Sequence, residues 1–74
     1  MADIILDCRN LNCPMPIVKI AKAIKTMDID QTLEVTATDP AFKADVEAWI
    51  RKTGNEMVTF EDGAEKKALL KKTV

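Results

Sequence analysis

The chain has 74 residues, 47% of them apolar, and a formal net charge of −1. This length predicts a single domain over residues 1–74 with a modest core, and the near-neutral charge without a basic block argues against direct binding to nucleic acid. Two cysteines and no histidine cannot supply the ligands of a zinc site, so no metal is expected. No segment resembles a membrane span or a signal peptide, and we expect a cytoplasmic protein with reduced thiols.

The first apolar run, Ile4-Ile5-Leu6 with Cys8, is rich in β-branched residues and predicts a buried strand. We expect Cys8 to be a small buried residue of that strand. A polar turn follows, in which Asn10 is a candidate for a left-handed backbone, since asparagine tolerates that conformation better than most residues.

A helix is predicted from about Pro14 to Met27, because an apolar stripe recurs at helical spacing. The stripe consists of Ile17, Ile20, Ala21, Ile24 and Met27. Proline is tolerated in the first turn of a helix, so Pro14 and Pro16 fit a helix start. Cys13, which follows Asn12, is then expected at or next to the N-cap.

A sulfur at this place would lie near unpaired backbone N–H groups and the positive end of the helix dipole. Such an environment favours the thiolate and predicts a Cys13 pKa below the reference of about 8.5. Arg9 and Lys19 are the nearest cations in sequence, and Met15 is a candidate apolar contact beside the sulfur. The helix lysines form either a solvated face or a docking patch for acidic partners.

The candidate chemistry of Cys13 is limited by its neighbours. No histidine exists to act as a base, which disfavours a cysteine-protease mechanism and leaves redox or sulfur-transfer chemistry. Cys8 lies five residues before Cys13, so the pair is not a Cys-x-x-Cys motif. The alternative interpretation of Cys13 is an inert buried cysteine.

Residues 33–38 alternate apolar and polar side chains, which predicts a half-buried strand. Asp39 as N-cap and Pro40 at the first helical position predict a second helix. This helix should end near Thr53, with Gly54 as its left-handed cap. Its apolar face consists of Phe42, Val46, Trp49 and Ile50.

Residues 56–61 predict a third strand, and Asp62-Gly63 predicts a two-residue hairpin turn. A fourth strand should extend to about Lys72. Its consecutive apolar residues, Ala68-Leu69-Leu70, leave the buried face open. Lysines at positions 66, 67, 71 and 72 suggest an edge strand.

The element order βαβαββ predicts an α/β two-layer sandwich, with a mixed four-stranded sheet and two helices on one face. The first two strands are expected to be parallel, so the turns that follow them should share one rim of the sheet. Cys13 and Asp39 would then lie on the same rim.

At this point the sequence resembles a known family. Leu6-Asp7 followed by Leu11-x-Cys13-Pro14-x-Pro16 resembles the signature of the TusA/SirA family of small sulfur carriers. Asp39-Pro40-Ala41 resembles that family's second recurrent turn. The chain has Asn10 where the family often has glycine, and Met15 where it often has an acidic residue.

The resemblance implies a fold like the C-terminal domain of translation initiation factor three. It implies that Cys13 accepts sulfane sulfur as a persulfide and hands it to a protein partner, as a carrier with sulfurtransferase-type transfer rather than a stand-alone turnover enzyme. Pro14, Pro16 and Asn12 would shape the turn, and Asp39 would be a site neighbour. No cofactor is implied beyond the covalent persulfide sulfur.

For partners, the resemblance implies a cysteine desulfurase or a rhodanese as sulfur donor. The acceptor would serve tRNA thiolation, molybdenum-cofactor assembly, or sulfur oxidation through a DsrE-type protein. Two alternatives stay open: a non-catalytic regulatory or interaction module on the same fold, and a redox protein that uses Cys8 and Cys13.

Overall fold

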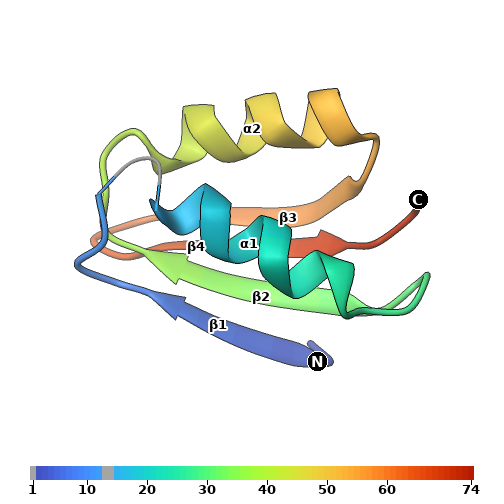
Figure 1. Cartoon of the computed structure of the whole chain (residues 1–74). Coiled ribbons are helices and arrows are strands. Elements are labelled where there is room, and N and C mark those ends of the chain that lie inside the picture. The colour runs from blue at the N-terminus through green and yellow to red at the C-terminus, as the bar shows by residue number, and fades with distance from the viewer. Residues whose placement is uncertain (1, 13–14) are drawn as a thin grey trace.

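The predicted α/β two-layer sandwich and its βαβαββ order are confirmed. The structure, a computed structural model, describes residues 2–12 and 15–74. Both helices cover one face of a four-stranded mixed sheet (Figure 1). The elements are β1 (Ile4–Cys8), α1 (Met15–Lys25), β2 (Thr32–Ala37), α2 (Phe42–Thr53), β3 (Glu56–Asp62) and β4 (Lys66–Lys71). Within the described residues, neither helix is long and apolar enough to cross a bilayer.

The strand order is β1-β2-β4-β3, so the prediction that the fourth strand lies at an edge was wrong. β1 and β2 are parallel, and β4 is antiparallel to both β2 and β3. Ala68 pairs with Val35 and Leu70 with Leu33, which places apolar side chains of both strands in the core. The lysines next to them in sequence, Lys67 and Lys71, therefore face the opposite side of the sheet.

β1, predicted as a buried strand, is instead an edge strand with one exposed face. Among the described residues it pairs only with β2, and none of them forms a layer over the sheet face away from the helices. The side chain of Ile5 is accordingly 71% exposed, whereas Cys8 is fully buried. Ile4 and Leu6 pack against the core from intermediate positions.

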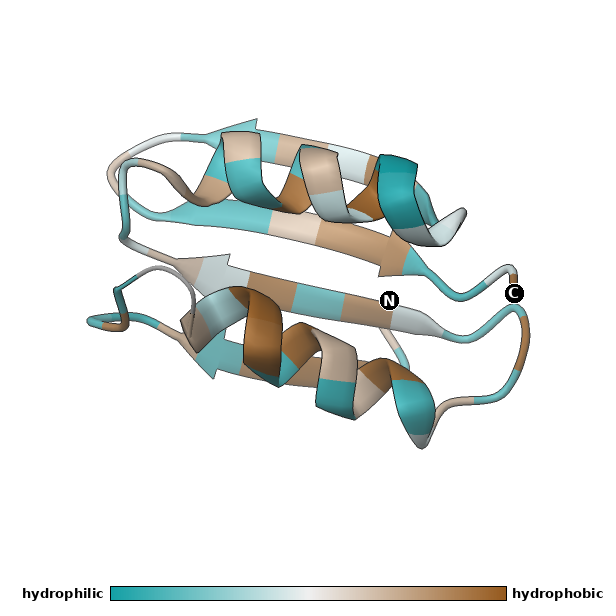
Figure 2. Cartoon of the chain, turned by 45° about the horizontal axis from the view of Figure 1, so that its top comes forward, coloured by the Kyte–Doolittle hydropathy of each residue, from teal (hydrophilic) through white to brown (hydrophobic). Residues whose placement is uncertain are grey.

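The core lies between the helices and the sheet. The predicted stripe of α2 is confirmed, and that of α1 is confirmed except at Ala21, in whose place Ala23 packs against the core. Ile20 and Ile24 of α1 and Phe42 and Val46 of α2 are buried, while Trp49 packs against them from the margin. Apolar and polar segments alternate around both helices (Figure 2), as amphipathic helices require. Each fully buried large side chain contributes roughly 1.5–3 kcal/mol to folding.

The helix ends follow the predictions in part. Gly54 ends α2 in a left-handed conformation (φ 84°), and its N–H donates to Ile50 O at 2.9 Å, as predicted. The predicted start at Pro40 was two residues early. Asp39 Oδ1 accepts the N–H of Ala41 at 3.0 Å and its carbonyl accepts the N–H of Phe42 at 3.0 Å. These two bonds form a tight turn that precedes the helix, and Ala41 occupies the N-cap instead of Asp39.

Two other boundaries differ from the predictions. α1 ends at Lys25, and single turns carry the chain on to Met27. The hairpin between β3 and β4 has a three-residue loop, because Asp62 is still paired with Lys66 in the ladder. The Asp62 and Lys66 side chains also form an ion pair at 3.3 Å. The prediction of a two-residue turn was therefore wrong.

Candidate functional site

The carboxyl ends of β1 and β2 lie at the same edge of the sheet, as predicted, because the two strands are parallel. Segment 9–12 and the turn before α2 therefore meet at one rim (Figure 1). The N–H of Asn10 donates to Thr38 Oγ1 at 2.9 Å and ties the two turns together. Asn10 has φ 65°, which confirms its predicted left-handed backbone.

Cys13 and Pro14 lie outside the described residues, so the predicted helix-capping position of Cys13 and the turn-shaping role of Pro14 remain predictions. The residues on either side are described. The N–H of Met15 donates to Asn12 O at 2.8 Å. Pro16 is fully buried in the first turn of α1, while Met15 is 45% exposed and Asn12 is exposed. Pro16 therefore anchors the start of α1 to the core.

Arg9, the first residue after β1, is held by two carboxylates. Its Nε donates to Asp7 Oδ1 and its Nη2 to Asp7 Oδ2, both at 3.0 Å. Its Nη1 lies 3.5 Å from Glu65 Oε2. The hydrogen bonds from Arg9 lower the pKa of Asp7 to about 2, and Asp7 in turn raises the pKa of Arg9. Arg9, a candidate site neighbour as the nearest cation in sequence, is engaged within this cluster.

Cys8, the last residue of β1, is fully buried, as predicted. Burial raises the pKa of its thiol, the positive charge of Lys19 opposes that shift, and the negative charge of Asp7 adds to it. Cys8 is therefore a protonated and poorly accessible thiol at neutral pH. Lys19 is exposed on α1. The positive charge of Lys19 also lowers the pKa of Asp7.

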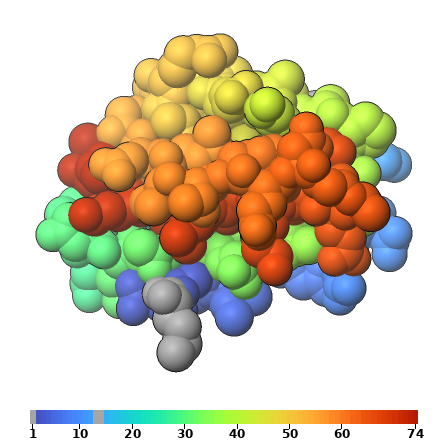
Figure 3. All heavy atoms as spheres, turned by 180° about the vertical axis from the view of Figure 1, so that it is seen from behind, coloured from blue at the N-terminus to red at the C-terminus, as the bar shows by residue number. Residues whose placement is uncertain are grey.

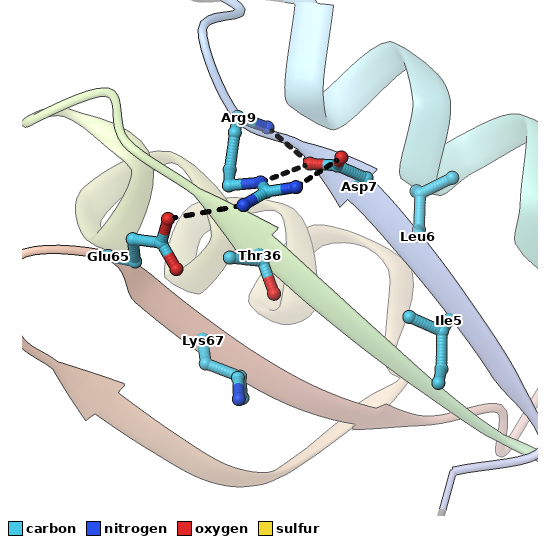
Figure 4. Close-up of a pocket in the computed structure, with 7 residues that line it drawn as sticks. All are labelled: Ile5, Leu6, Asp7, Arg9, Thr36, Glu65 and Lys67. Atoms are coloured by element: carbon cyan, nitrogen blue, oxygen red, sulfur yellow. Dashed lines mark hydrogen bonds and ion pairs between the residues drawn. The ribbon is translucent and has the colours of Figure 1, made fainter.

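A shallow groove of about 310 Å³ lies on the sheet face away from the helices (Figure 4). Figure 3 shows the molecule from behind. The Arg9 cluster, which consists of Arg9, Asp7 and Glu65, lies on the same face as the groove (Figure 4). The groove is lined by Ile5, Leu6, Asp7, Arg9, Thr36, Glu65 and Lys67. No local pattern in the sequence predicts this groove, because it depends on β4 lying beside β2 instead of at an edge.

The described residues offer few other groups that could take part in thiol chemistry or bind a metal ion. Within residues 2–12 and 15–74, Cys8 is the one free cysteine and no cluster of acidic or thiol side chains could hold a metal ion. The described part of this rim is segment 9–12, in which Arg9 and Asn10 form hydrogen bonds to Asp7 and Thr38, together with the exposed Met15 at the start of α1. Such an arrangement suits the presentation of a reactive group to another molecule.

Comparisons with known proteins give one consistent result. A family model described as sulfurtransferase TusA matches residues 4–72. The sulfur carrier protein TusA of Allochromatium vinosum is 41% identical over 69 residues, which cover 92% of this chain and 91% of that protein. YrkF of Bacillus subtilis is 47% identical over 60 residues, or 81% of this chain, but this stretch spans only 32% of its length.

A structural likeness supports the fold. The crystal structure of a SirA-like protein from Desulfitobacterium hafniense superposes with a TM-score of 0.80, covering 96% of this chain and 99% of that one. The two sequences are 14% identical, so the likeness concerns the fold alone.

Proposed function

Since the chain belongs to the TusA family, we propose that it accepts sulfane sulfur as a persulfide on Cys13 and passes this sulfur to a partner protein. By family the chain is a sulfur carrier, and a carrier needs a sulfur donor and a sulfur acceptor.

The observation that carries the assignment to Cys13 is the burial of Cys8. The chain has two cysteines, and Cys8 is fully buried with a raised pKa. A sulfur carrier needs a thiol that a second protein can reach and that ionises near neutral pH. Cys8 meets neither requirement. Cys13 lies between the anchored segment 9–12 and the buried Pro16, and it begins the motif that resembles the family signature.

The transfer step is an exchange between sulfur atoms. The Cys13 thiolate attacks the outer sulfur of the donor's persulfide and forms a new S–S bond. The donor's own S–S bond breaks, and its electron pair leaves on the donor cysteine as a thiolate. Delivery repeats the step with the acceptor thiolate as nucleophile. No net oxidation occurs, so the chain needs no redox cofactor for this step.

We propose a cysteine desulfurase or a rhodanese as the donor, and an acceptor in tRNA thiolation, cofactor assembly or DsrE-type sulfur oxidation. We propose the cytoplasm as the compartment, because thiols stay reduced there. The burial of Cys8 weighs against a dithiol redox protein, because a disulfide partner must be accessible to exchange.

The experiment is a two-step relay with radiolabelled sulfane sulfur. Persulfide-loaded rhodanese is mixed with the reduced chain, which is repurified and then given a thiol acceptor. Wild type should take up and release label, whereas Cys13→Ser should take up none and Cys8→Ala should behave like wild type. Uptake by Cys13→Ser at the wild-type level would reject the assignment to Cys13 and indicate another sulfur site. No uptake by wild type from an active donor would reject the carrier role and favour a regulatory module.

A further inference from the structure

Arg9 lies at the start of the segment that leads from β1 to Cys13, and its side chain turns back over the open face of the sheet (Figure 4). There it makes a bidentate pair with Asp7 from its own strand end. It also contacts Glu65, which lies 56 residues away in the loop between β3 and β4. Arg9 thus connects the edge strand to the hairpin loop across β2.

The charges in this cluster do not suit Arg9 to activate a thiolate. One guanidinium faces two carboxylates, and the lowered pKa of Asp7 keeps that carboxylate ionised at neutral pH. The cluster therefore has a net negative charge. The Arg9 and Asp7 side chains are 50% and 59% exposed, so their pairing adds little to global stability. What a planar bidentate pair supplies is a fixed geometry.

The bidentate pair fixes the conformation of segment 9–11, where the chain leaves β1. The backbone N–H of Arg9 also donates to Asp7 Oδ1 at 3.0 Å, so a single carboxylate holds both the backbone and the side chain of Arg9. The next residue, Asn10, is bonded to Thr38, and the N–H of Leu11 points to Cys8 O at 3.4 Å. Each residue of segment 9–11 thus has a partner that limits its movement.

We infer that Arg9 is a positioning residue, which acts through Asp7 and Glu65 to fix where the loop leaves β1 and hence how Cys13 is presented. This inference rests on the proposed role of Cys13 and concerns orientation, not charge. Lysine keeps the charge of arginine but lacks the planar fork, so the inference predicts that lysine cannot replace Arg9.

The test compares Arg9→Lys, Arg9→Ala and Glu65→Gln, all in a Cys8→Ala background. Arg51→Lys is the matched control, because the chain's other arginine is exposed in the last turn of α2. Alkylation of Cys13 by iodoacetamide is followed against pH, and amide NMR shifts are recorded for residues 10–12. Thermal unfolding of each variant shows that the fold is intact.

If Arg9 positions the loop, both Arg9 variants should disturb the helix-start environment predicted for Cys13 and raise the pKa of Cys13 by up to about one unit. Alkylation at pH 7 should then slow roughly two- to fourfold in both, since higher thiolate nucleophilicity offsets about half of the lost ionisation. The shifts of residues 10–12 should move in both, and Glu65→Gln should give a smaller change of the same kind.

Two results would overturn the inference. If both Arg9 variants kept the wild-type alkylation rate of Cys13 and the wild-type amide shifts of residues 10–12, the cluster would not position the loop. A slower rate in Arg9→Ala that Arg9→Lys restores would assign Arg9 a charge role instead. The final extent of Cys13 loading by inorganic polysulfide, measured on the same samples, tests the proposed function separately, because it depends on the presence of the thiol and not on its rate of attack.

Discussion

Cys8 illustrates how burial removes a thiol from chemistry in a protein that handles sulfur. An accessible thiolate five residues from a persulfide could attack its inner sulfur, form a disulfide and expel hydrogen sulfide. In this fold Cys8 is fully buried, and burial raises the pKa of its thiol. Its side chain serves the core as a small apolar group. The same burial therefore protects the sulfur proposed to be carried on Cys13.

A Cys8→Ala substitution should accordingly leave sulfur loading at the wild-type level. We expect a loss of about 1 kcal/mol in the free energy of unfolding, because the smaller side chain leaves a small cavity. Loading measured by intact mass and unfolding measured in urea check the two parts. Lost loading with an intact fold would instead indicate that both cysteines take part in the chemistry.

At the scale of the elements, the C-terminal end of α1 is held by a residue far along the chain. Lys72 Nζ donates to Ile24 O and to Met27 O, both at 2.9 Å. The last carbonyl groups of a helix lack intrahelical partners, and a lysine there satisfies them and complements the helix dipole. Lys72 thus joins the end of β4 to the helix whose other end follows Cys13.

We predict that Lys72→Met lowers the free energy of unfolding by about 1–2 kcal/mol, since methionine keeps the apolar stem but donates no hydrogen bond. Lys71→Met is the matched control. Lys71 is paired with exposed Asp30 at 3.7 Å, and losing that pair should cost less than about 1 kcal/mol. Urea unfolding of both variants makes the comparison. Equal losses would mean that Lys72 is not a significant cap.

The elements themselves could be predicted because their signals are local. The helical stripes, the Gly54 cap and the left-handed Asn10 each depend on a few neighbouring residues, and all three are confirmed apart from Ala21 in the first stripe. The order of the strands could not be predicted in the same way. The lysines of β4 suggested an edge, but strand order depends on which faces match across the sheet, and β4 matches β2 through Ala68 and Leu70.

At the scale of the whole molecule, the rim and the open face come from contacts that no local pattern reports. The parallel pairing of β1 and β2 brings segment 9–12 beside Thr38, which the element order predicted. The Arg9–Glu65 contact spans 56 residues and depends on β4 lying inside the sheet. It could not be predicted, because the sequence pattern placed this strand at an edge. The candidate site was thus predictable where it is built by consecutive residues.

The central claim, that Cys13 carries the sulfur, has a direct test because trypsin cleavage after Arg9 separates the two cysteines. Cys8 then lies in residues 1–9 and Cys13 in residues 10–19. The reduced chain is loaded from a persulfide donor, free thiols and persulfides are blocked by alkylation, and the peptides are analysed by mass spectrometry. We predict one added sulfur atom on residues 10–19 and none on residues 1–9. Sulfur on residues 1–9, or on neither peptide with an active donor, would contradict the account.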